Sequence, residues 1–460
     1  MTIANETTRP TVVRTRSIAS DVLTPIGAYL ALGRPGASCL LESVESGGRI
    51  SRYSFVGIDY LQERSFEGDA EIFPQVRAFV AAHRIVEGGQ RPLGGALVAF
   101  SYDAARARAR LAPRPADPPA MPAAYVAIPA TWLIFDHFTD RLTIWTAGNE
   151  PAELERRIDG YVERLLQARP VLPEPVAAVG PVTQSIERER YLDLVRRVKE
   201  HVYEGDVYQL QLGIRFGAHL EGHAFDLYRA LRSRNPSPYM FYVDAPFGQV
   251  LGASPEFLVR LEGRRARIRP LAGTRSRGAD ESEDAAVAAE LLADPKERAE
   301  HVMLVDLGRN DLGRVCEPGT VEVVDLMRIE YYSHVMHIVS VVVGKLKEGM
   351  RPTDALKAAF PAGTVSGAPK IRSMEIINEL EPTRRGPYAG AIGYLSFHSG
   401  DLDTCICIRT IVVKDGVAYV QAGGGVVADS VPEREYEETR NKARALFSAI
   451  GLAQGQEEWE

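Results

Sequence analysis

Val412-Val-Lys-Asp-Gly-Val-Ala-Tyr-Val420 is the stretch of this chain that says most about its fold. Apolar residues on both sides of Asp415-Gly416 predict two antiparallel strands joined by a tight turn, because Asp-Gly accepts the positive φ angles that such a turn requires. Gln421-Ala-Gly-Gly-Gly-Val-Val-Ala-Asp-Ser430 follows as a predicted glycine-rich loop, and Glu433-Arg-Glu-Tyr-Glu-Glu-Thr-Arg-Asn-Lys-Ala443 as a charged helix. This order favours a fold that mixes antiparallel sheet with helices.

A second glycine-containing loop, Pro361-Ala-Gly-Thr-Val-Ser-Gly-Ala-Pro-Lys370, opens another predicted helix. Loops at helix N-termini leave backbone N–H groups free to bind an anion. Glu435 and Glu438 stand on one face of their predicted helix, and Glu297 and Glu300 repeat the same spacing earlier in the chain. Two carboxylate pairs and two anion-binding loops predict a hard cation and an acidic substrate.

Strands and helices alternate irregularly along the rest of the chain. Ala96–Phe100 and Ala130–Phe135 are short apolar runs typical of strands, and Ile186–His201 has the apolar spacing of an amphipathic helix. The mixed order predicts an α+β fold with antiparallel sheets rather than a regular βαβ array.

A proline-rich segment over residues 168–182 predicts a linker. It would separate an N-terminal region (1–167) from a C-terminal region (183–460). Within the first region, Arg106-Ala-Arg-Ala-Arg110 precedes the proline-rich stretch Pro113–Pro119. We expect the solvated end of a helix followed by a rigid loop here, rather than a polyanion site.

Composition excludes several classes of protein. A net charge of −7 offers no basic surface for nucleic acid, and four cysteines among 460 residues do not make a disulfide framework. We expect all four thiols to be buried and reduced. The N-terminus has no apolar signal segment, and no apolar run is long enough to span a bilayer, so we expect a cytoplasmic protein.

Four further motifs carry a family resemblance. They are Asn235-Pro-Ser-Pro-Tyr-Met-Phe241, Ile268-Arg-Pro-Leu-Ala-Gly-Thr-Arg275, Val305-Asp-Leu-Gly-Arg-Asn-Asp-Leu-Gly-Arg314 and Tyr332-Ser-His-Val-Met-His337. With the two loops, they resemble the chorismate-utilising enzymes, and most closely the large subunits of anthranilate synthases, over nearly the whole chain.

The resemblance implies both a fold and an activity. The fold would be two large, mostly antiparallel sheets packed as a sandwich, with helices outside and the active site in the cleft between the sheets. The activity would be that of a lyase, which converts chorismate and ammonia to anthranilate and pyruvate in the first committed step of tryptophan biosynthesis.

The resemblance also assigns a metal site. Mg²⁺ prefers oxygen ligands and retains waters, and Glu297, Glu300, Glu435 and Glu438 take this role by resemblance. On the residues alone, Glu438 and Lys442 fit an ordinary surface ion pair four residues apart on a helix.

Several residues are implied to bind or transform the substrate. Arg409, at the end of the predicted strand Thr404–Arg409, would bind the enolpyruvyl carboxylate together with Tyr388; an internal Arg–Glu bridge is the alternative. His337 is the expected general acid, with His334 as a structural partner on the same predicted helical face. Backbone N–H groups of Gly423, Gly424 and Gly425 would hold a carboxylate, and Thr274 and Thr364 would contact the ring region. Gly424 departs from the alanine that the family usually has.

Two positions favour an amine-adding member of the family. Ala272 stands where the aminodeoxychorismate synthases carry a nucleophilic lysine. Gln209 stands where the isochorismate and salicylate synthases have a lysine that activates water, and glutamine has no useful basicity. Leu210-Gln-Leu-Gly213 departs from the family's usual sequence, so the resemblance does not define the shape of this wall of the pocket.

The resemblance further implies that residues 1–167 are regulatory, that residues 183–460 are catalytic, and that tryptophan inhibits the enzyme by feedback. The tryptophan pocket would be formed by residues of the N-terminal half and of the first family motif: Glu42, Ser43, Asn235, Pro236, Met240 and Phe241. No Gly-x-Cys-x-Gly glutaminase nucleophile occurs in the sequence. We therefore expect a separate amidotransferase subunit to supply ammonia in a hetero-oligomer.

Two alternatives remain at this level. One is an amine-adding relative that stops at 2-amino-2-deoxyisochorismate without expelling pyruvate. The other is a non-catalytic paralogue that only binds tryptophan.

Overall fold

The computed structural model describes residues 12–44, 52–67, 71–83, 85, 95–109, 111–169, 171–332, 335–397 and 400–451. The strands are β1 (Val12–Ala19), β2 (Ser38–Glu42), β3 (Tyr53–Phe66), β4 (Gly95–Phe100), β5 (Ala124–Asp136), β6 (Arg141–Gly148), β7 (Ala177–Gln184), β8 (Gln209–Glu221), β9 (Tyr239–Ala245), β10 (Gly248–Ser254), β11 (Phe257–Glu262), β12 (Arg265–Ile268), β13 (Leu271–Ser276), β14 (Glu322–Tyr331), β15 (Val335–Lys345), β16 (Gly367–Ala368), β17 (Ala391–Ser396), β18 (Leu402–Ile406), β19 (Thr410–Lys414) and β20 (Val417–Val426).

The helices are α1 (Pro25–Leu32), α2 (Ile72–Ala82), α3 (Arg106–Ala109), α4 (Pro151–Gln167), α5 (Arg188–Tyr203), α6 (Ala224–Arg234), α7 (Glu281–Ala293), α8 (Pro295–Gly313), α9 (Pro352–Ala359), α10 (Lys370–Leu380) and α11 (Pro432–Phe447). Short 3-10 turns occupy Tyr102–Ala105, Gly363–Val365 and Ser448–Ile450. None of the described helices is long and apolar enough to cross a membrane.

Strand β5 is the branch point of the sheet. Its whole length pairs with β3 along one edge, whereas the other edge pairs with β4 near Ala124 and with β6 near Thr131. The sequence explains this central place, because Ala124-Tyr-Val-Ala-Ile-Pro-Ala-Thr-Trp-Leu-Ile-Phe135 is apolar on both faces and buried throughout.

Two arms leave this branch point. One runs from β3 through β2, β9, β10, β19, β20 and β8 to β7, and the other from β4 through β17, β18, β11 and β12 to β15, which also pairs with β13 and β14. All pairings among the described strands are antiparallel, so the predicted α+β class is confirmed. Since the pairings join these strands into one network, the division into two sheets stays a prediction.

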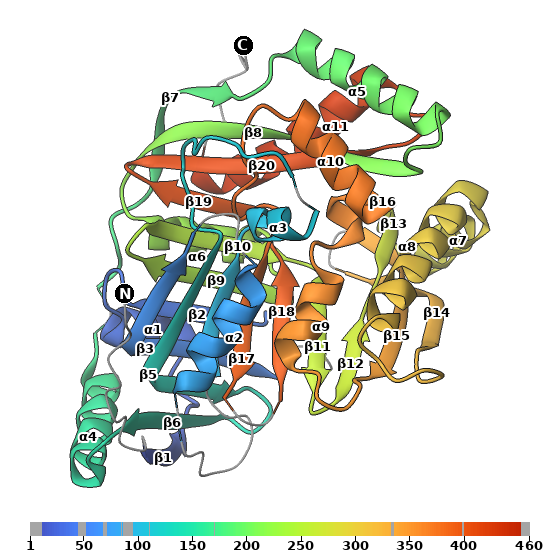
Figure 1. Cartoon of the computed structure of the whole chain (residues 1–460). Coiled ribbons are helices and arrows are strands. Elements are labelled where there is room, and N and C mark those ends of the chain that lie inside the picture. Colours follow the sequence, from blue (N-terminus) through green and yellow to red (C-terminus); the bar gives the residue numbers. More distant parts are fainter. Residues whose placement is uncertain are drawn as a thin grey trace.

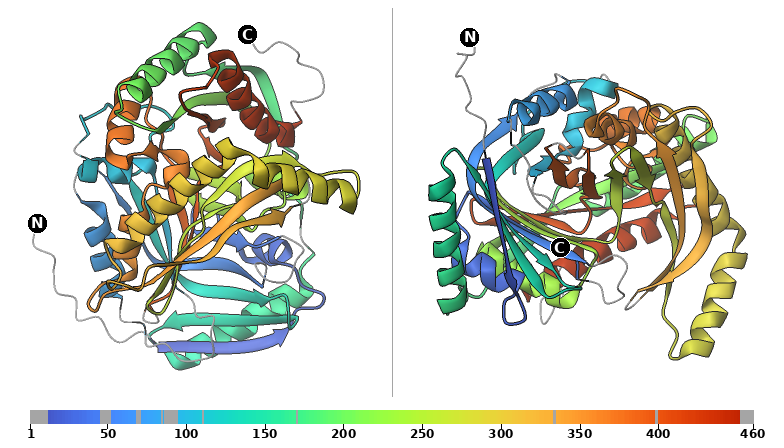
Figure 2. Two further views of the ribbon diagram at one scale, coloured as in Figure 1. Left: turned by 90° about the vertical axis from the view of Figure 1, so that its right-hand side faces the viewer. Right: turned by 90° about the horizontal axis from the view of Figure 1, so that it is seen from below.

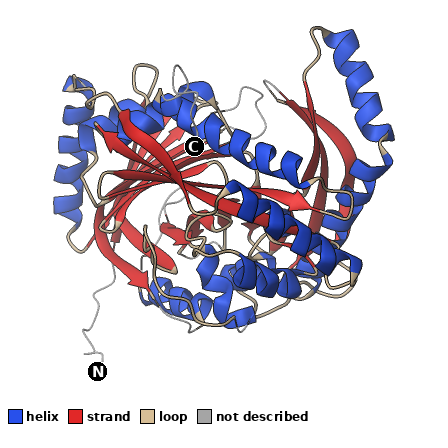
Figure 3. Ribbon diagram, turned by 90° about the horizontal axis from the view of Figure 1, so that it is seen from above, coloured by secondary structure: helices blue, strands red, loops and turns tan. Residues whose placement is uncertain are grey.

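Helices lie on the outside of this sheet (Figure 3). Figure 1 shows α5, α10 and α11 near β8 and β20, and α7 and α8 beside β14 and β15. In both views of Figure 2, α4 lies far from the pair α7 and α8, with the strands between them. The helix α11 packs on β20, the strand that precedes it in the sequence.

Most elements expected from the sequence are present. The predicted turn joins β19 to β20, and both Asp415 (φ 51°) and Gly416 (φ 73°) have the positive φ that the Asp-Gly pair predicts. All four cysteines are buried and free. The domain division stays a prediction, although residues 177–182 of the predicted linker belong to strand β7.

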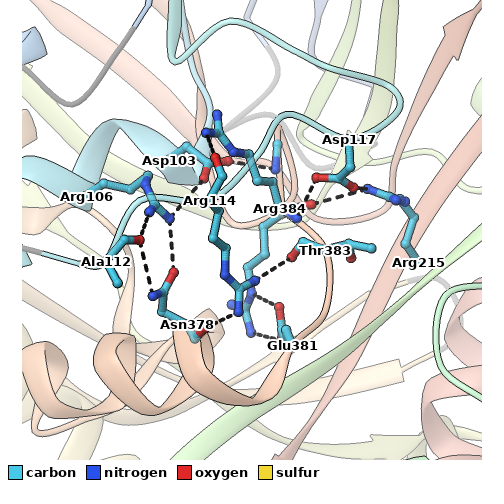
Figure 4. Close-up of polar contacts among 12 residues, drawn as sticks. Asp103, Arg106, Ala112, Arg114, Asp117, Arg215, Asn378, Glu381, Thr383 and Arg384 are labelled. Carbon is cyan, nitrogen blue, oxygen red and sulfur yellow. Dashed lines mark hydrogen bonds and ion pairs between the residues drawn. The ribbon is translucent and has the colours of Figure 1, made fainter.

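The prediction of a solvated arginine-rich helix end was wrong. Arg106 is buried and donates to Asn378 Oδ1 over 3.0 Å, and Arg108 donates to the carbonyl of Phe360 over 2.9 Å. Arg114, in the proline-rich stretch, donates to the carbonyls of Asn378 and Thr383 (Figure 4). Helix C-termini leave carbonyls without partners, and these arginines supply donors at the ends of α9 and α10.

Candidate active site

A cavity of about 940 Å³, here called the larger cavity, lies between β13, β15, β8, β20 and α11. Nine of the residues predicted to form sites line it: Asn235, Pro236, Thr274, His337, Thr364, Tyr388, Arg409, Gly423 and Glu438. Residues separated by two hundred positions in the sequence thus share one wall, which makes this cavity the candidate active site.

His337 lies in strand β15 and not on a helix, so the predicted helical pairing with His334 was wrong; His334 itself is outside the described residues. The register partner of His337 is Thr274 on β13, and Thr274 Oγ1 lies 3.0 Å from His337 Nδ1. Burial lowers the pKa of His337 to about 4. The imidazole is therefore neutral near pH 7 and held at a defined orientation.

Glu256 is a residue of this cavity that the sequence interpretation missed. Its side chain is buried, and burial raises the pKa of its carboxyl to about 8, only partly offset by the charge of Arg269 and the polarity of the nearby Thr364 side chain. The carboxyl is thus largely protonated near pH 7 and can donate a proton. A glutamate between the apolar strands β10 and β11 is the signal that could have revealed it.

Arg409 and Tyr388 both line the larger cavity from connecting segments. Arg409 lies between β18 and β19, and Tyr388 shortly precedes β17. The prediction that Arg409 stands at the end of a strand was wrong. Arg409 lies beyond the end of β18 and has a left-handed φ of 50°. Its side chain is exposed in the cavity. Tyr388 is buried, and burial raises its pKa to about 12, so it is a neutral hydrogen-bond donor.

The three glycines predicted as a loop are part of strand β20, where they pair with Gly213, Leu212 and Gln211 of β8. A Cβ atom at Gly423 would lie 3.0 Å from Tyr388 Oη, and one at Gly424 would lie 2.9 Å from Glu435 Oε2. At Gly425 it would lie 2.5 Å from Gln209 Nε2. The glycines therefore allow functional side chains to approach the strand, and the loop prediction was wrong.

The four predicted metal-binding glutamates lie in pairs on α8 and α11. Glu300 accepts a hydrogen bond from Gln209 Nε2 over 2.9 Å, Glu297 pairs with Arg275 at 3.0 Å, and Glu438 pairs with Lys442 at 2.7 Å. Burial and the neighbouring charge of Glu438 raise the pKa of Glu435. A cation would relieve this repulsion, so the donor set fits a hard cation.

The glutamates do not form a compact ligand cluster, however. Throughout the described ranges, only His201, Glu204 and Asp206 bring three possible ligand atoms within 4.8 Å of one another. Asp206 already pairs with Arg372 at 2.8 Å. That group shares no residue with the predicted metal ligands.

A smaller cavity of about 290 Å³ separates the two arms of the sheet, between β2, β9, β11, β17 and β18. Four of the residues predicted to bind tryptophan line it: Glu42, Ser43, Met240 and Phe241. Asn235 and Pro236 line the larger cavity instead, so the structure divides the predicted set. The segment Asn235–Phe241 thus borders both cavities, and the Val44 N–H ties it to β2 by donating to the carbonyl of Ser237 over 3.3 Å.

Comparison with known proteins identifies the class. Residues 37–448 match the chorismate binding enzyme family, and the chain belongs to that family. It is 45% identical to anthranilate synthase component 1 of Thermus thermophilus, over 95% of this chain and 98% of that protein. Identity to the Streptomyces coelicolor anthranilate synthase component 1 is 44%, over 94% and 88% respectively.

Solved structures agree. Anthranilate synthase component I of Streptococcus pneumoniae has a TM-score of 0.78 at 35% identity, covering 93% of this chain and 98% of that one. The menaquinone-specific isochorismate synthase of Escherichia coli has a TM-score of 0.76 at 19% identity, covering 95% and 94%, which shows a shared fold alone. The resemblance seen in the sequence is thus confirmed, and the chain is an enzyme of the anthranilate synthase component 1 branch.

Proposed function

We propose that the chain converts chorismate and ammonia to anthranilate and pyruvate. The proposal rests on one observation: the side-chain amide of Gln209, the first residue of β8, donates a hydrogen bond to Glu300. An amide cannot activate water as a lysine would, whereas ammonia needs no base in order to attack. Ala272, on β13, likewise offers no nucleophile for a covalent intermediate.

The larger cavity can bind a dianion by its side chains. Arg409 supplies a guanidinium and Tyr388 a hydroxyl for the enolpyruvyl carboxylate. Thr274 and Thr364 contact the ring, and Gly423 lets the strand approach it. We assign the ring carboxylate to the end of the cavity that Glu438 lines, where Mg²⁺ would be held by Glu297, Glu300, Glu435 and Glu438. Bound there, the ion would neutralise charge on that carboxylate.

Two groups are placed to move protons. Glu256, protonated near neutral pH, gives its proton to the hydroxyl that leaves as water when ammonia forms the new C–N bond. In the second step a ring proton is removed, the ether C–O bond breaks, and the enolpyruvyl fragment gains a proton and departs as pyruvate. We assign this transfer to His337, whose neutral imidazole, oriented by Thr274, can take the ring proton and return it.

The wider setting is also part of the proposal. A separate glutamine amidotransferase subunit supplies ammonia in a hetero-oligomer, and tryptophan inhibits by binding in the smaller cavity. The two arms of the sheet act as two packed sheets with the active site in the cleft between them. We propose that the enzyme works in the cytoplasm.

One assay tests the central proposal. Purified chain, chorismate, an ammonium salt and Mg²⁺ are expected to produce fluorescent anthranilate and an equal amount of pyruvate. Accumulation of non-aromatic 2-amino-2-deoxyisochorismate would instead assign the chain to an enzyme without pyruvate loss. Absence of any chorismate consumption would contradict both.

A further inference from the structure

Arg385 lies directly behind the wall of the larger cavity without lining it. Only 4% of the residue is exposed, and it follows α10 in the segment that leads to Tyr388. A guanidinium buried this deeply is expected to have a defined set of partners, because an unsatisfied buried charge is strongly unfavourable.

Two of these partners are backbone groups of the cavity wall. Arg385 Nη1 donates to the carbonyl of Val365 over 2.7 Å, and Nη2 donates to the carbonyl of Gln211 over 2.7 Å. Both residues line the larger cavity, and Val365 directly follows Thr364. One planar group therefore fixes the distance between the Thr364 turn and strand β8.

The same guanidinium contacts aromatic rings. Its Cζ lies 5.5 Å from the ring centre of Tyr388, which lines the larger cavity, and 4.8 Å from that of Tyr102, which does not. Both distances are within the range of cation–π attraction. Tyr388 is thus held from behind by the cation that also holds Val365 and Gln211.

Glu381 fixes the guanidinium itself. Arg385 Nε donates to Glu381 Oε2 over 2.9 Å, and Nη2 donates to Oε1 over 2.5 Å. Glu381 Oε1 also accepts the Gly213 N–H over 2.8 Å, and Gly213 pairs with Gly423 of the cavity wall. Buried ion pairs add little net stability, so geometric definition is the better explanation for this one.

We propose that Arg385 is a positioning residue for catalysis, which sets the relative placement of Thr364, Gln211 and Tyr388 around chorismate. This inference rests on the proposed function, because Thr364 and Tyr388 are assigned there to the substrate and Gln211 lines the same cavity. Lysine cannot replace it, since an ammonium lacks the planar fork that reaches two carbonyls and a carboxylate together.

Arg385→Lys tests the proposal, with the adjacent Arg384→Lys as matched control. Arg384 contacts Arg114 and Asp117, neither of which lines the larger cavity (Figure 4). The measurements are kcat, KM for chorismate, KM for ammonia and the melting temperature. Arg385→Lys is expected to lower kcat/KM for chorismate by about tenfold to hundredfold, the cost of misplacing groups by around 1 Å. Its KM for ammonia and the kinetics of Arg384→Lys are expected to stay at parent values.

A purely structural role would give a different result. It would lower the melting temperature of Arg385→Lys while the folded enzyme kept the parent kcat/KM, and that outcome would overturn the proposal. Should Arg385→Lys not fold, Tyr102→Leu removes one ring from the guanidinium without touching the cavity. It is expected to raise KM for chorismate, and an unchanged KM would overturn the proposal as well.

Failure of the proposed function has its own signature. In that case the parent enzyme itself would form no anthranilate, and chorismate affinities would be compared by calorimetry instead. Equal affinities of the parent and Arg385→Lys would then overturn the positioning role independently.

Discussion

Gln209 donates a hydrogen bond from Nε2 to Glu300 Oε1 over 2.9 Å, and this contact joins the first residue of β8 to helix α8. Gly425 makes room for it, because a Cβ there would lie 2.5 Å from the same nitrogen. A predicted catalytic residue and a predicted metal ligand thus orient each other.

Gln209→Leu removes this hydrogen bond while keeping a side chain of similar size. The loss of one hydrogen bond to a charged group costs about 1.5–3 kcal/mol, so the apparent affinity for Mg²⁺ is expected to fall about tenfold to hundredfold. Activity measured across a Mg²⁺ titration checks this. A variant with the parent's Mg²⁺ dependence would separate Gln209 from the metal site.

Glu256→Gln keeps the shape of the side chain but removes its acidic proton. We expect kcat to fall about 10²- to 10⁴-fold, the usual contribution of a general acid. The parent should lose activity as pH rises through about 8, because the protonated carboxyl is the active form and its pKa is about 8. The pH profile of kcat checks this, and a parent rate that stays flat from pH 7 to 9 would assign the acid elsewhere.

Glu256→Gln, which should lower activity, is expected to raise the stability of the folded protein at high pH. The folded-state pKa of Glu256 is raised above its unfolded value, so the parent has its full stability below the unfolded pKa and loses stability as pH rises through about 8. Glu256→Gln has no such loss. Unfolding followed at pH 6 and pH 9 should show the variant gaining on the parent at the higher pH.

His337→Met should slow the second step more than the first. Because burial lowers the pKa of His337 to about 4, the imidazole is neutral above that pH and its role should not vary between pH 6 and pH 8. The variant is expected to accumulate 2-amino-2-deoxyisochorismate, detected by chromatography. Stoichiometric anthranilate at the parent rate would show that another group transfers this proton.

Glu438→Ala tests the proposed metal site. Removing one carboxylate of the α11 pair is expected to lower activity by about tenfold to hundredfold, comparable to the loss of other groups that support a metal. EDTA should silence the parent. As a control, Glu433→Ala removes an exposed carboxylate of the same helix that lines neither cavity, and it should keep the parent's activity. Full parental activity in chelator would remove the metal from the proposal.

Ser43→Phe tests the smaller cavity. A phenyl ring should occupy part of its 290 Å³ at the edge where Ser43 lies, and leave an active enzyme that tryptophan no longer inhibits. Inhibition curves with tryptophan at fixed chorismate check this. Linkage adds a requirement on the parent, where chorismate must weaken tryptophan binding by the same factor that tryptophan weakens chorismate binding.

The elements that could be predicted from the sequence were those whose own residues carry the structural signal. The Asp415-Gly416 turn and the periodic helices α5 and α11 needed only their own residues. The family resemblance singled out His337, Arg409 and Glu438, which the fold brings to the larger cavity, while their roles stay predictions. The glycines at 423–425 were placed in a loop because three glycines usually break a strand; in the fold they are required by side chains that arrive from distant segments. Glu256 could have been noticed locally as a glutamate between two apolar strands, but its protonation depends on burial among α8, the Thr364 turn and β18, which are distant in the sequence.

The arginines after Tyr102 show the same limit. Arg106 and Arg108 carry charge in a run that looks solvated, but the fold packs the ends of α9 and α10 against them. Arg106 thereby becomes a buried donor and Arg108 a half-buried one. Long-range partners decide burial, and a single sequence does not display them.

Asn235–Phe241 forms part of the wall of both cavities, and this has a consequence for how the enzyme can change over generations. Under the proposed regulation, a substitution at Met240 or Phe241 that frees the enzyme from tryptophan lies in the same short segment as Asn235 and Pro236, which line the larger cavity. A backbone shift in this segment therefore reaches the proposed active site, so relief from inhibition and catalytic performance are coupled there. Ser43 and Glu42 border the smaller cavity alone. Under the proposed regulation, selection or engineering for deregulated tryptophan production should therefore find its least costly solutions at Ser43, directly after β2, and its most compromised ones in the segment Asn235–Phe241.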